Sequence, residues 1–512
     1  MRSEVTRIAG NYLRLMAGFV IGLLLVRQLL NYGSDIFNIF TIVTVGAGVG
    51  IMLRELLRIA LTSHLSEAWA GRDEAGGHEA FRGVFRQAMA LSAVACLVGL
   101  ALMAMLALAL PRLDIAAENI GAARVFVGAR AVILAATVLI SPLLTMLMVM
   151  QRFGRMNTLM TLERVADFIA VLLPLVLLAP GFEGGSALIL FGLASAALTS
   201  SLYLFAAWRI VREAPELLRP GWSWGALDKR KALTRSILWA LALVFSFNLY
   251  LRFDTFFINA HFGAAATIAF GLTVQLIGMV RQLTAGIVMG LDAVAAKFRF
   301  GAREADRGGG FDRILALSNY LQTIISGSAI VMLSVWLDEL LQLWVGGRVP
   351  DASVLELTRS LVLVMLFGIA AIALSDGWAG ALDGTGKNRL YVRYTATLAA
   401  ANAAALLVLG QLGLVTPLGL AFLFSGLLAI GHLLIVPQVY AKETGVPVRT
   451  LLAPILRGMP APALSAAVSL TLHDRLAALH PLAAVIISGS IVGLIALADV
   501  ALYLRGTRTS GA

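Results

Sequence analysis

The sequence lacks most of the residues that an enzyme site or a disulfide-bonded domain requires. Its 512 residues include a single cysteine, Cys96, and only 13% of them are charged. One cysteine excludes an internal disulfide and suits a small buried apolar side chain. No metal-ligand cluster and no Gly-rich phosphate loop occurs, and His64 and His261 stand alone near the ends of apolar runs. We therefore predict that the chain is not an enzyme and has no catalytic residue, metal or cofactor.

Apolar residues dominate the sequence. They make up 59% of the chain, and runs of roughly 18 residues or more, the length that marks a membrane span, recur from end to end. Fourteen spans are predicted, near residues 12–31, 36–62, 83–111, 121–150, 157–179, 186–210, 233–258, 264–296, 312–337, 354–383, 389–410, 414–438, 449–472 and 481–505. The predicted fold class is therefore an all-α polytopic membrane protein with about 14 transmembrane helices.

Basic residues predict how the chain lies in the membrane. The net charge of +11 would fit a nucleic-acid-binding protein, but in a membrane protein excess Lys and Arg mark the cytoplasmic loops. Most of them fall in alternate loops, around 72–86, 152–155, 212–235, 297–313, 387–389 and 442–449. This asymmetry predicts a bacterial inner-membrane protein with both termini in the cytoplasm and no nucleic-acid partner. The first apolar run contains Arg27 and no clear cleavage site, so we predict a permanent span rather than a signal peptide.

The chain resembles itself at an offset of 230 residues. Over residues 33–81 this offset pairs nine identical residues in 49 positions, including Gly33 with Gly263 and Gly48 with Gly278. Two related membrane halves are typical of secondary transporters, whose site lies between the halves. We predict a six-helix lobe at 1–211, a cytoplasmic linker at 212–232, a second six-helix lobe at 233–445 and two extra transmembrane helices at 446–512.

Several arginines lie inside predicted spans, where each costs roughly 2.5–3.5 kcal/mol on insertion scales. They are Arg27, Arg54, Arg58, Arg252 and Arg281. Glu55 can pair with Arg58 on the same helix, but the other four have no obvious partner nearby in the sequence. We predict that these arginines line a hydrated cationic cavity that binds an anion, because the guanidinium group matches phosphate oxygens. The alternative is that they form salt bridges between helices or, for Arg27 above all, extend toward the membrane surface.

Acidic residues inside the spans suggest a second role. Asp254, Asp376, Glu163 and Asp167 are candidates for binding a coupling H⁺ or Na⁺, and the last two share one face of the fifth span. Arg164 could instead neutralise Asp167 at i,i+3. Coupling to an ion is also not obligatory, because the membrane voltage alone favours outward movement of an anion.

Three segments resemble one family of membrane proteins. They are RFDTFFINAHFGAAATIAFGLTVQLIGMVRQ from Arg252, LVRQLLNYGSDIFNIFTIVTVGAGVGI from Leu25, and GALDGTGKNRL followed by GLVTPLGLAFLFSGLL. These segments are similar to the polysaccharide-transport proteins, including Wzx-like and MurJ-like flippases, of the multidrug/oligosaccharidyl-lipid/polysaccharide (MOP) exporter superfamily. The resemblance covers residues 1–445.

The resemblance implies two lobes that alternate access around a central cavity. The implied cargo is a polyprenyl-diphosphate-linked oligosaccharide, flipped to the outer leaflet for lipopolysaccharide, capsule or exopolysaccharide synthesis. Basic residues in the first, second, seventh and eighth spans would hold the diphosphate, and Arg27, Arg54, Arg252 and Arg281 occupy those spans. The implied partners are this lipid-linked cargo, membrane lipids and polysaccharide-assembly proteins.

Two alternatives remain open from the sequence. A proton- or sodium-coupled multidrug exporter of the same superfamily would depend on the acidic residues and carry small cations. A membrane polymerase or ligase would be expected to carry a large outer loop with catalytic residues, which the predicted loops do not provide.

Overall fold

The structure is a computed structural model. It describes residues 2–46, 48–72, 76–150, 152–178, 181–215, 238–239, 254–288, 310–349, 351–384, 389–476 and 479–509, together with Ser246, Leu291 and Lys387. Throughout these residues the regular structure is helical, as expected of long apolar segments, because in lipid the backbone must satisfy its hydrogen bonds internally.

Eleven helices of the described chain are long and apolar enough to cross a membrane. Three predicted spans are not among them. Those at 36–62 and 157–179 are helical but carry several ionisable residues each, and the one at 233–258 falls largely outside the described residues. The spans that hold the charged candidates thus differ in composition from the purely apolar ones.

The chain divides into two compact units, Met1–Gly271 and Leu272–Ala512. We call them unit 1 and unit 2. The predicted linker at 212–232 lies almost entirely outside the described residues.

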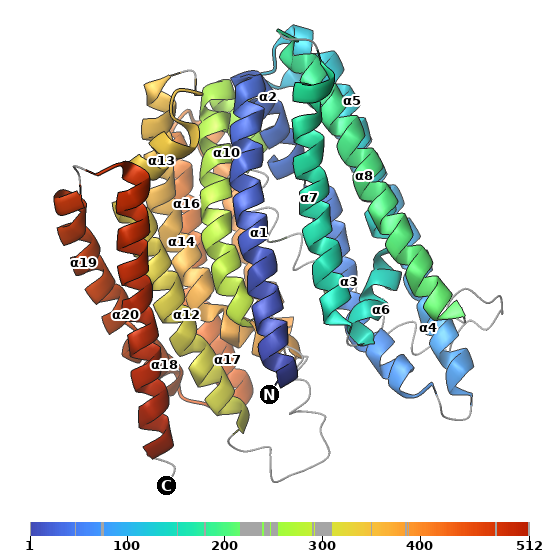
Figure 1. The fold of residues 1–512 in the computed structure, drawn as a ribbon. Helices are drawn as coiled ribbons and strands as arrows, with labels where there is room; N and C mark the ends of the chain where they lie inside the picture. The colour runs from blue at the N-terminus through green and yellow to red at the C-terminus, as the bar shows by residue number, and fades with distance from the viewer. Residues whose placement is uncertain are drawn as a thin grey trace. The chain divides into compact units, whose positions relative to one another are not determined.

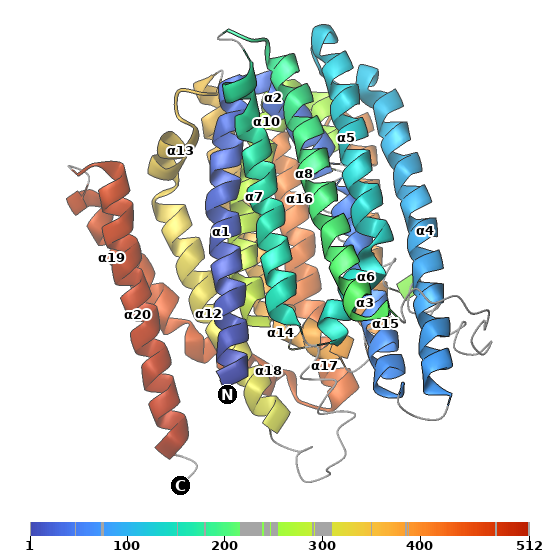
Figure 2. The ribbon, with the colours of Figure 1, turned by 45° about the vertical axis from the view of Figure 1, so that its right-hand side comes forward.

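Unit 1 is a helical bundle that begins with α1 (Arg2–Tyr32). Its further helices are α2 (Ser34–Phe40), the π-helix η1 (Thr41–Gly46), α3 (Val49–Ala70), α4 (Gly77–Ala109), the short η2 (Leu110–Arg112) and η3 (Ala117–Asn119), α5 (Ile120–Leu139), α6 (Ser141–Val149), α7 (Phe153–Leu177), α8 (Gly184–Glu213) and the first part of α10 (Asp254–Val288). α8 packs against both α5 and α7, and α7 also packs against α1 (Figure 1). Figure 2 shows α4 beside α5 at the edge of this bundle. Phe126 and Phe191 stack at 5.6 Å between centroids and join α5 to α8.

Two predicted spans of unit 1 are interrupted. The second span is divided between α2, η1 and α3, and the interruption falls at the Gly-rich stretch 46–50, where Gly48 has a positive φ of 23°. The fourth span divides into α5 and α6, and Pro142 lies in the first turn of α6, where its missing N–H is tolerated.

The backbone repeats one feature at the predicted offset of 230 residues. Gly33 (φ 134°) ends α1, and Gly263 (φ 78°) breaks the helical path inside α10. Both conformations favour glycine because a Cβ is strained at positive φ. The correspondence does not extend to the next pair, because Gly48 has a positive φ whereas Gly278 lies within the helix.

Unit 2 contains the rest of α10 and the helices that follow residue 309. They are α12 (Gly310–Val335), α13 (Leu337–Val345), α14 (Ala352–Gly384), α15 (Arg389–Gln411), α16 (Pro417–Ala429), the π-helix η7 (Ile430–Ile435), α17 (Val436–Thr444), α18 (Val448–Gly458), α19 (Pro460–Leu476) and α20 (Pro481–Thr509). α14 packs against α12 and α16, and α12 also packs against α18, α19 and α20 (Figure 1). The predicted thirteenth span consists of α18 and α19, which meet at Pro460.

Candidate functional site

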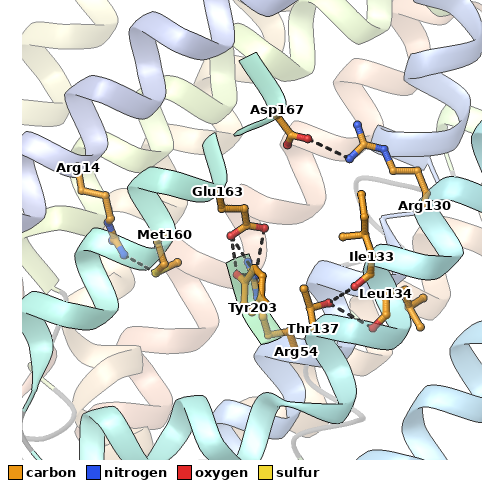
Figure 3. A network of polar contacts seen from close by, with 10 residues as sticks. All are labelled: Arg14, Arg54, Arg130, Ile133, Leu134, Thr137, Met160, Glu163, Asp167 and Tyr203. Atoms are coloured by element: carbon orange, nitrogen blue, oxygen red, sulfur yellow. Dashed lines mark hydrogen bonds and ion pairs between the residues drawn. The ribbon is translucent and has the colours of Figure 1, made fainter. Parts of the chain in front are cut away.

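Arg54, Glu163 and Tyr203 form a buried polar cluster in unit 1. Arg54 on α3 donates from Nη1 to Glu163 Oε1 and Oε2 on α7, at 3.2 and 3.1 Å. The same nitrogen donates to Tyr203 Oη on α8 at 2.5 Å, and Tyr203 Oη donates to Glu163 Oε2 at 2.7 Å. The side chains of Arg54 and Glu163 are only 15% and 17% exposed, so water screens their attraction weakly. The three groups therefore form a closed set of charge-assisted hydrogen bonds between three helices (Figure 3).

A second ion pair lies one helical turn along α7. Asp167, four residues after Glu163, lies 3.5 Å from Arg130 Nη1 on α5. Ser195 on α8 also donates a short hydrogen bond to Asp167. The Arg130 guanidinium lies over the rings of Phe126 and Phe191, at 5.1 and 5.4 Å from their centroids. Aromatic faces of this kind hold a guanidinium group in a fixed plane.

Arg14 on α1 joins the same region of unit 1. Its Nη1 donates to Met160 Sδ on α7 at 2.7 Å, one turn before Glu163 (Figure 3). We call Arg14, Arg54, Arg130, Glu163, Asp167, Ser195 and Tyr203 the unit 1 polar network. It contains three guanidinium groups and two carboxylates, so positive charge exceeds negative charge by one.

Unit 2 has its own pair of opposite charges. Arg281 on α10 donates from Nη2 to Asp376 Oδ1 on α14 at 3.0 Å, and its Nη1 contacts the other carboxylate oxygen. The Asp376 side chain is 14% exposed and that of Arg281 is 33% exposed. Arg281 is therefore the more accessible member of the pair.

These pairs correct the expectation that Arg54 and Arg281 lack partners. Each arginine is bonded to a carboxylate on another helix, and both carboxylates, Glu163 and Asp376, had been predicted as ion-binding groups. The expectation was wrong because it considered partners only within one helix. Likewise Asp167 pairs with Arg130 rather than with Arg164, which is exposed on α7.

The other predicted residues lie apart from these pairs. Arg27 is exposed on α1, and Arg58 is partly exposed one turn after Arg54 on α3. Asp254, at the beginning of α10, is 2% exposed. Arg252 lies outside the described residues.

Several residues of the network were missed by the sequence analysis. Arg130 could have been found, because it lies inside the predicted fourth span. Ser195 and Tyr203 are neutral and give only a weak signal, a spacing of eight residues that places both on one face of α8. No group of three or more His, Cys, Asp or Glu side chains among the described residues could hold a metal ion.

No family profile matches the sequence, and no curated protein sequence matches it significantly. Similar folds are found among solved structures. The lipid II flippase MurJ, in an inward closed conformation, is 11% identical over 97% of this chain and 99% of its own, with a TM-score of 0.61. A MOP superfamily transporter from Pyrococcus furiosus is 13% identical over 89% of this chain and 95% of its own, with a TM-score of 0.62. The MATE multidrug transporter DinF-BH is 15% identical over 86% of this chain and 96% of its own, with a TM-score of 0.64.

These similarities confirm the predicted fold class and the resemblance on which it rested. The similar proteins are transporters rather than enzymes, in agreement with the prediction. At such low identity the similarity concerns the fold and not the cargo. The chain is a multi-pass membrane protein with the transporter fold of the MOP superfamily.

Proposed function

We propose that this protein is a flippase that moves a polyprenyl-diphosphate-linked oligosaccharide from the inner to the outer leaflet by alternating access. In this proposal the diphosphate binds at the unit 1 polar network. The sugar crosses with it, while the prenyl chain stays in lipid.

The observation that carries the proposal is the excess of arginine over carboxylate in that network. Three guanidinium groups face two carboxylates inside a helical bundle, where an unbalanced charge is costly. Arg130 also keeps a buried Nε without a hydrogen-bond partner among the described residues. A diphosphate supplies negative charge and several acceptor oxygens, and arginine binds such groups through paired hydrogen bonds. A cationic cargo would add to the imbalance.

The carboxylates are compatible with this role. In the absence of cargo, Glu163 and Asp167 hold Arg54 and Arg130 in fixed orientations between α3, α5 and α7. Preorganised donors of this kind bind an anion with little further ordering. Arg164, exposed beside Glu163 on α7, adds positive charge to the same helix.

The extent of the structural similarity also supports a flippase. The match to MurJ covers 97% of this chain, whereas the match to DinF-BH leaves 14% (100% − 86%) without a counterpart. That share is close to the 67 of 512 residues in the predicted extra segment 446–512. The complete chain thus resembles a lipid-linked precursor flippase in length.

Other parts of the mechanism remain predictions. They are the lobes at 1–211 and 233–445 with the linker 212–232, headgroup contacts by Arg27, Arg58, Arg252 and Arg281, a bacterial inner-membrane location, and the identity of any coupling ion.

A second candidate function is a cation-coupled multidrug exporter. The observation in its favour is the pair of carboxylates, Glu163 and Asp167, on one face of α7 in a membrane-spanning bundle. Such groups can bind protons or sodium ions. The similarity to DinF-BH fits this candidate.

The test is reconstitution of the purified protein in proteoliposomes. One assay follows a fluorescent polyprenyl-diphosphate saccharide becoming accessible to a membrane-impermeable quencher, and the other follows efflux of a fluorescent organic cation under a proton gradient. We expect flipping by the native protein. Arg54→Gln and Arg130→Gln should each slow it by about 10- to 100-fold, since a charge-assisted hydrogen bond contributes about 1.5–3 kcal/mol.

The matched control is Arg475→Gln, which removes an exposed arginine near the end of α19. It should flip at the native rate. Full flipping by both network variants would exclude the proposed headgroup site. Cation efflux without flipping would favour the exporter.

A further inference from the structure

Unit 2 contains a buried histidine that the sequence analysis did not single out. His432 lies in the π-helix η7, between α16 and α17, and is 4% exposed. π-helical turns inside α-helices are often found at functional sites. A titratable side chain buried at such a turn, in a helix of otherwise apolar character, calls for a partner.

The partner is Ser375 on α14, which is fully buried. Its Oγ lies 2.6 Å from His432 Nδ1 and also donates to the carbonyl oxygen of Ile372 at 3.1 Å. A hydroxyl group has only one proton to donate, so Ser375 accepts from His432 Nδ1–H. This contact assigns the proton of the neutral ring to Nδ1 and makes Nε2 the nitrogen that can bind a second proton.

The ion pair of unit 2 is adjacent to this contact. Asp376, which pairs with Arg281, directly follows Ser375 on α14. Arg281 lies within electrostatic range of His432. One carboxylate, one guanidinium and one imidazole therefore meet in a small buried region. A single carboxylate can balance only one positive charge at low dielectric, so Arg281 and a protonated His432 would compete for Asp376.

The helices packed against η7 bring few other titratable groups near His432. They are α14, α15, α16 and α17. α16 has no titratable residue, and on α17 the nearest, Tyr440, is eight residues along the helix, about 12 Å by helical rise. On α15, Leu398 is the residue that approaches the backbone at Gly431. The titratable residues of that helix lie in its first two turns, and they are Arg389, Tyr391, Arg393 and Tyr394.

We propose that His432 is a proton-binding site whose occupancy alternates with the Arg281–Asp376 ion pair. While Arg281 is bonded to Asp376, His432 stays neutral. When Arg281 leaves Asp376, His432 takes up one proton at Nε2 and the imidazolium replaces the guanidinium as the cation that balances Asp376. If Arg281 leaves to bind an anionic cargo, a step that rests on the proposed function, each binding event is accompanied by the uptake of one proton.

The experiment is an NMR titration of the full-length protein in lipid nanodiscs with ¹⁵N-labelled histidine. The chain has six histidines, and the spectrum of His432→Gln identifies the signal of His432. In Arg281→Gln, which frees Asp376, we expect His432 to become protonated at a pH higher by about one unit or more than in the native protein. Arg281→Lys keeps the cation and should titrate like the native protein.

A third variant isolates the role of the carboxylate. In the double variant Arg281→Gln, Asp376→Asn no charge is left to balance, so the titration of His432 should shift back from that of Arg281→Gln toward lower pH. His78→Gln, which changes an exposed histidine at the beginning of α4, should leave the His432 titration unchanged.

The proposal is overturned if His432 titrates alike in the native protein and Arg281→Gln, or if Asp376→Asn has no effect in the double variant. No cargo is present in these titrations. A protein that fails to flip the labelled saccharide would therefore refute the proposed function without altering their result.

Discussion

Tyr203 Oη lies 2.7 Å from Glu163 Oε2 and is the donor in that contact. Because the same oxygen accepts from Arg54, the hydroxyl group links a carboxylate on α7 to a guanidinium group on α3. Tyr203 itself is 1% exposed. The contact shows that the charges inside unit 1 are organised by a neutral residue on a third helix, α8.

The Arg54–Glu163 pair should dominate the stability of unit 1. We expect Arg54→Gln or Glu163→Gln to lower the free energy of unfolding by about 3–5 kcal/mol each, because either change leaves one buried charge unbalanced. The double variant should lose much less than the sum, since it removes both charges together. Thermal unfolding in detergent measures all three. Strictly additive losses would contradict a direct interaction between the two side chains.

Gly263 should tolerate alanine poorly. Its φ of 78° disfavours any Cβ, and an added Cβ would lie 2.8 Å from Asp114 Oδ2, which accepts a hydrogen bond from Ala264 N–H. We expect Gly263→Ala to destabilise the protein by about 1–2 kcal/mol, seen as a lower Tm. Gly278→Ala is the matched control, because an added Cβ there meets no atom within 4 Å. Equal Tm values for the two variants would exclude strain at Gly263.

The predicted orientation can be tested with single cysteines. Cys96 is the only native cysteine, so Cys96→Ala gives a background without thiols. In that background we expect His480→Cys to react with a membrane-impermeable maleimide added to intact cells, and Lys442→Cys to react only after the cells are opened. Both positions are exposed in the structure. The reverse labelling pattern would place the termini on the outer side.

The sequence by itself determined the membrane class, the helical character and most span positions. These depend on local composition and period, because a helix in lipid satisfies its own backbone. The position of the break at Gly263 was also legible from its counterpart Gly33, since positive φ is a property of a single residue.

Only the tertiary structure decided which charges meet. Arg54 and Glu163 are 109 residues apart, and Arg281 and Asp376 are 95 apart, so no pattern along one helix relates them. Tyr203, Ser195 and Ser375 are neutral and leave no trace in the charge distribution. Their roles arise from helix packing, which brings groups from different parts of the chain to within hydrogen-bond distance in a region that water screens weakly.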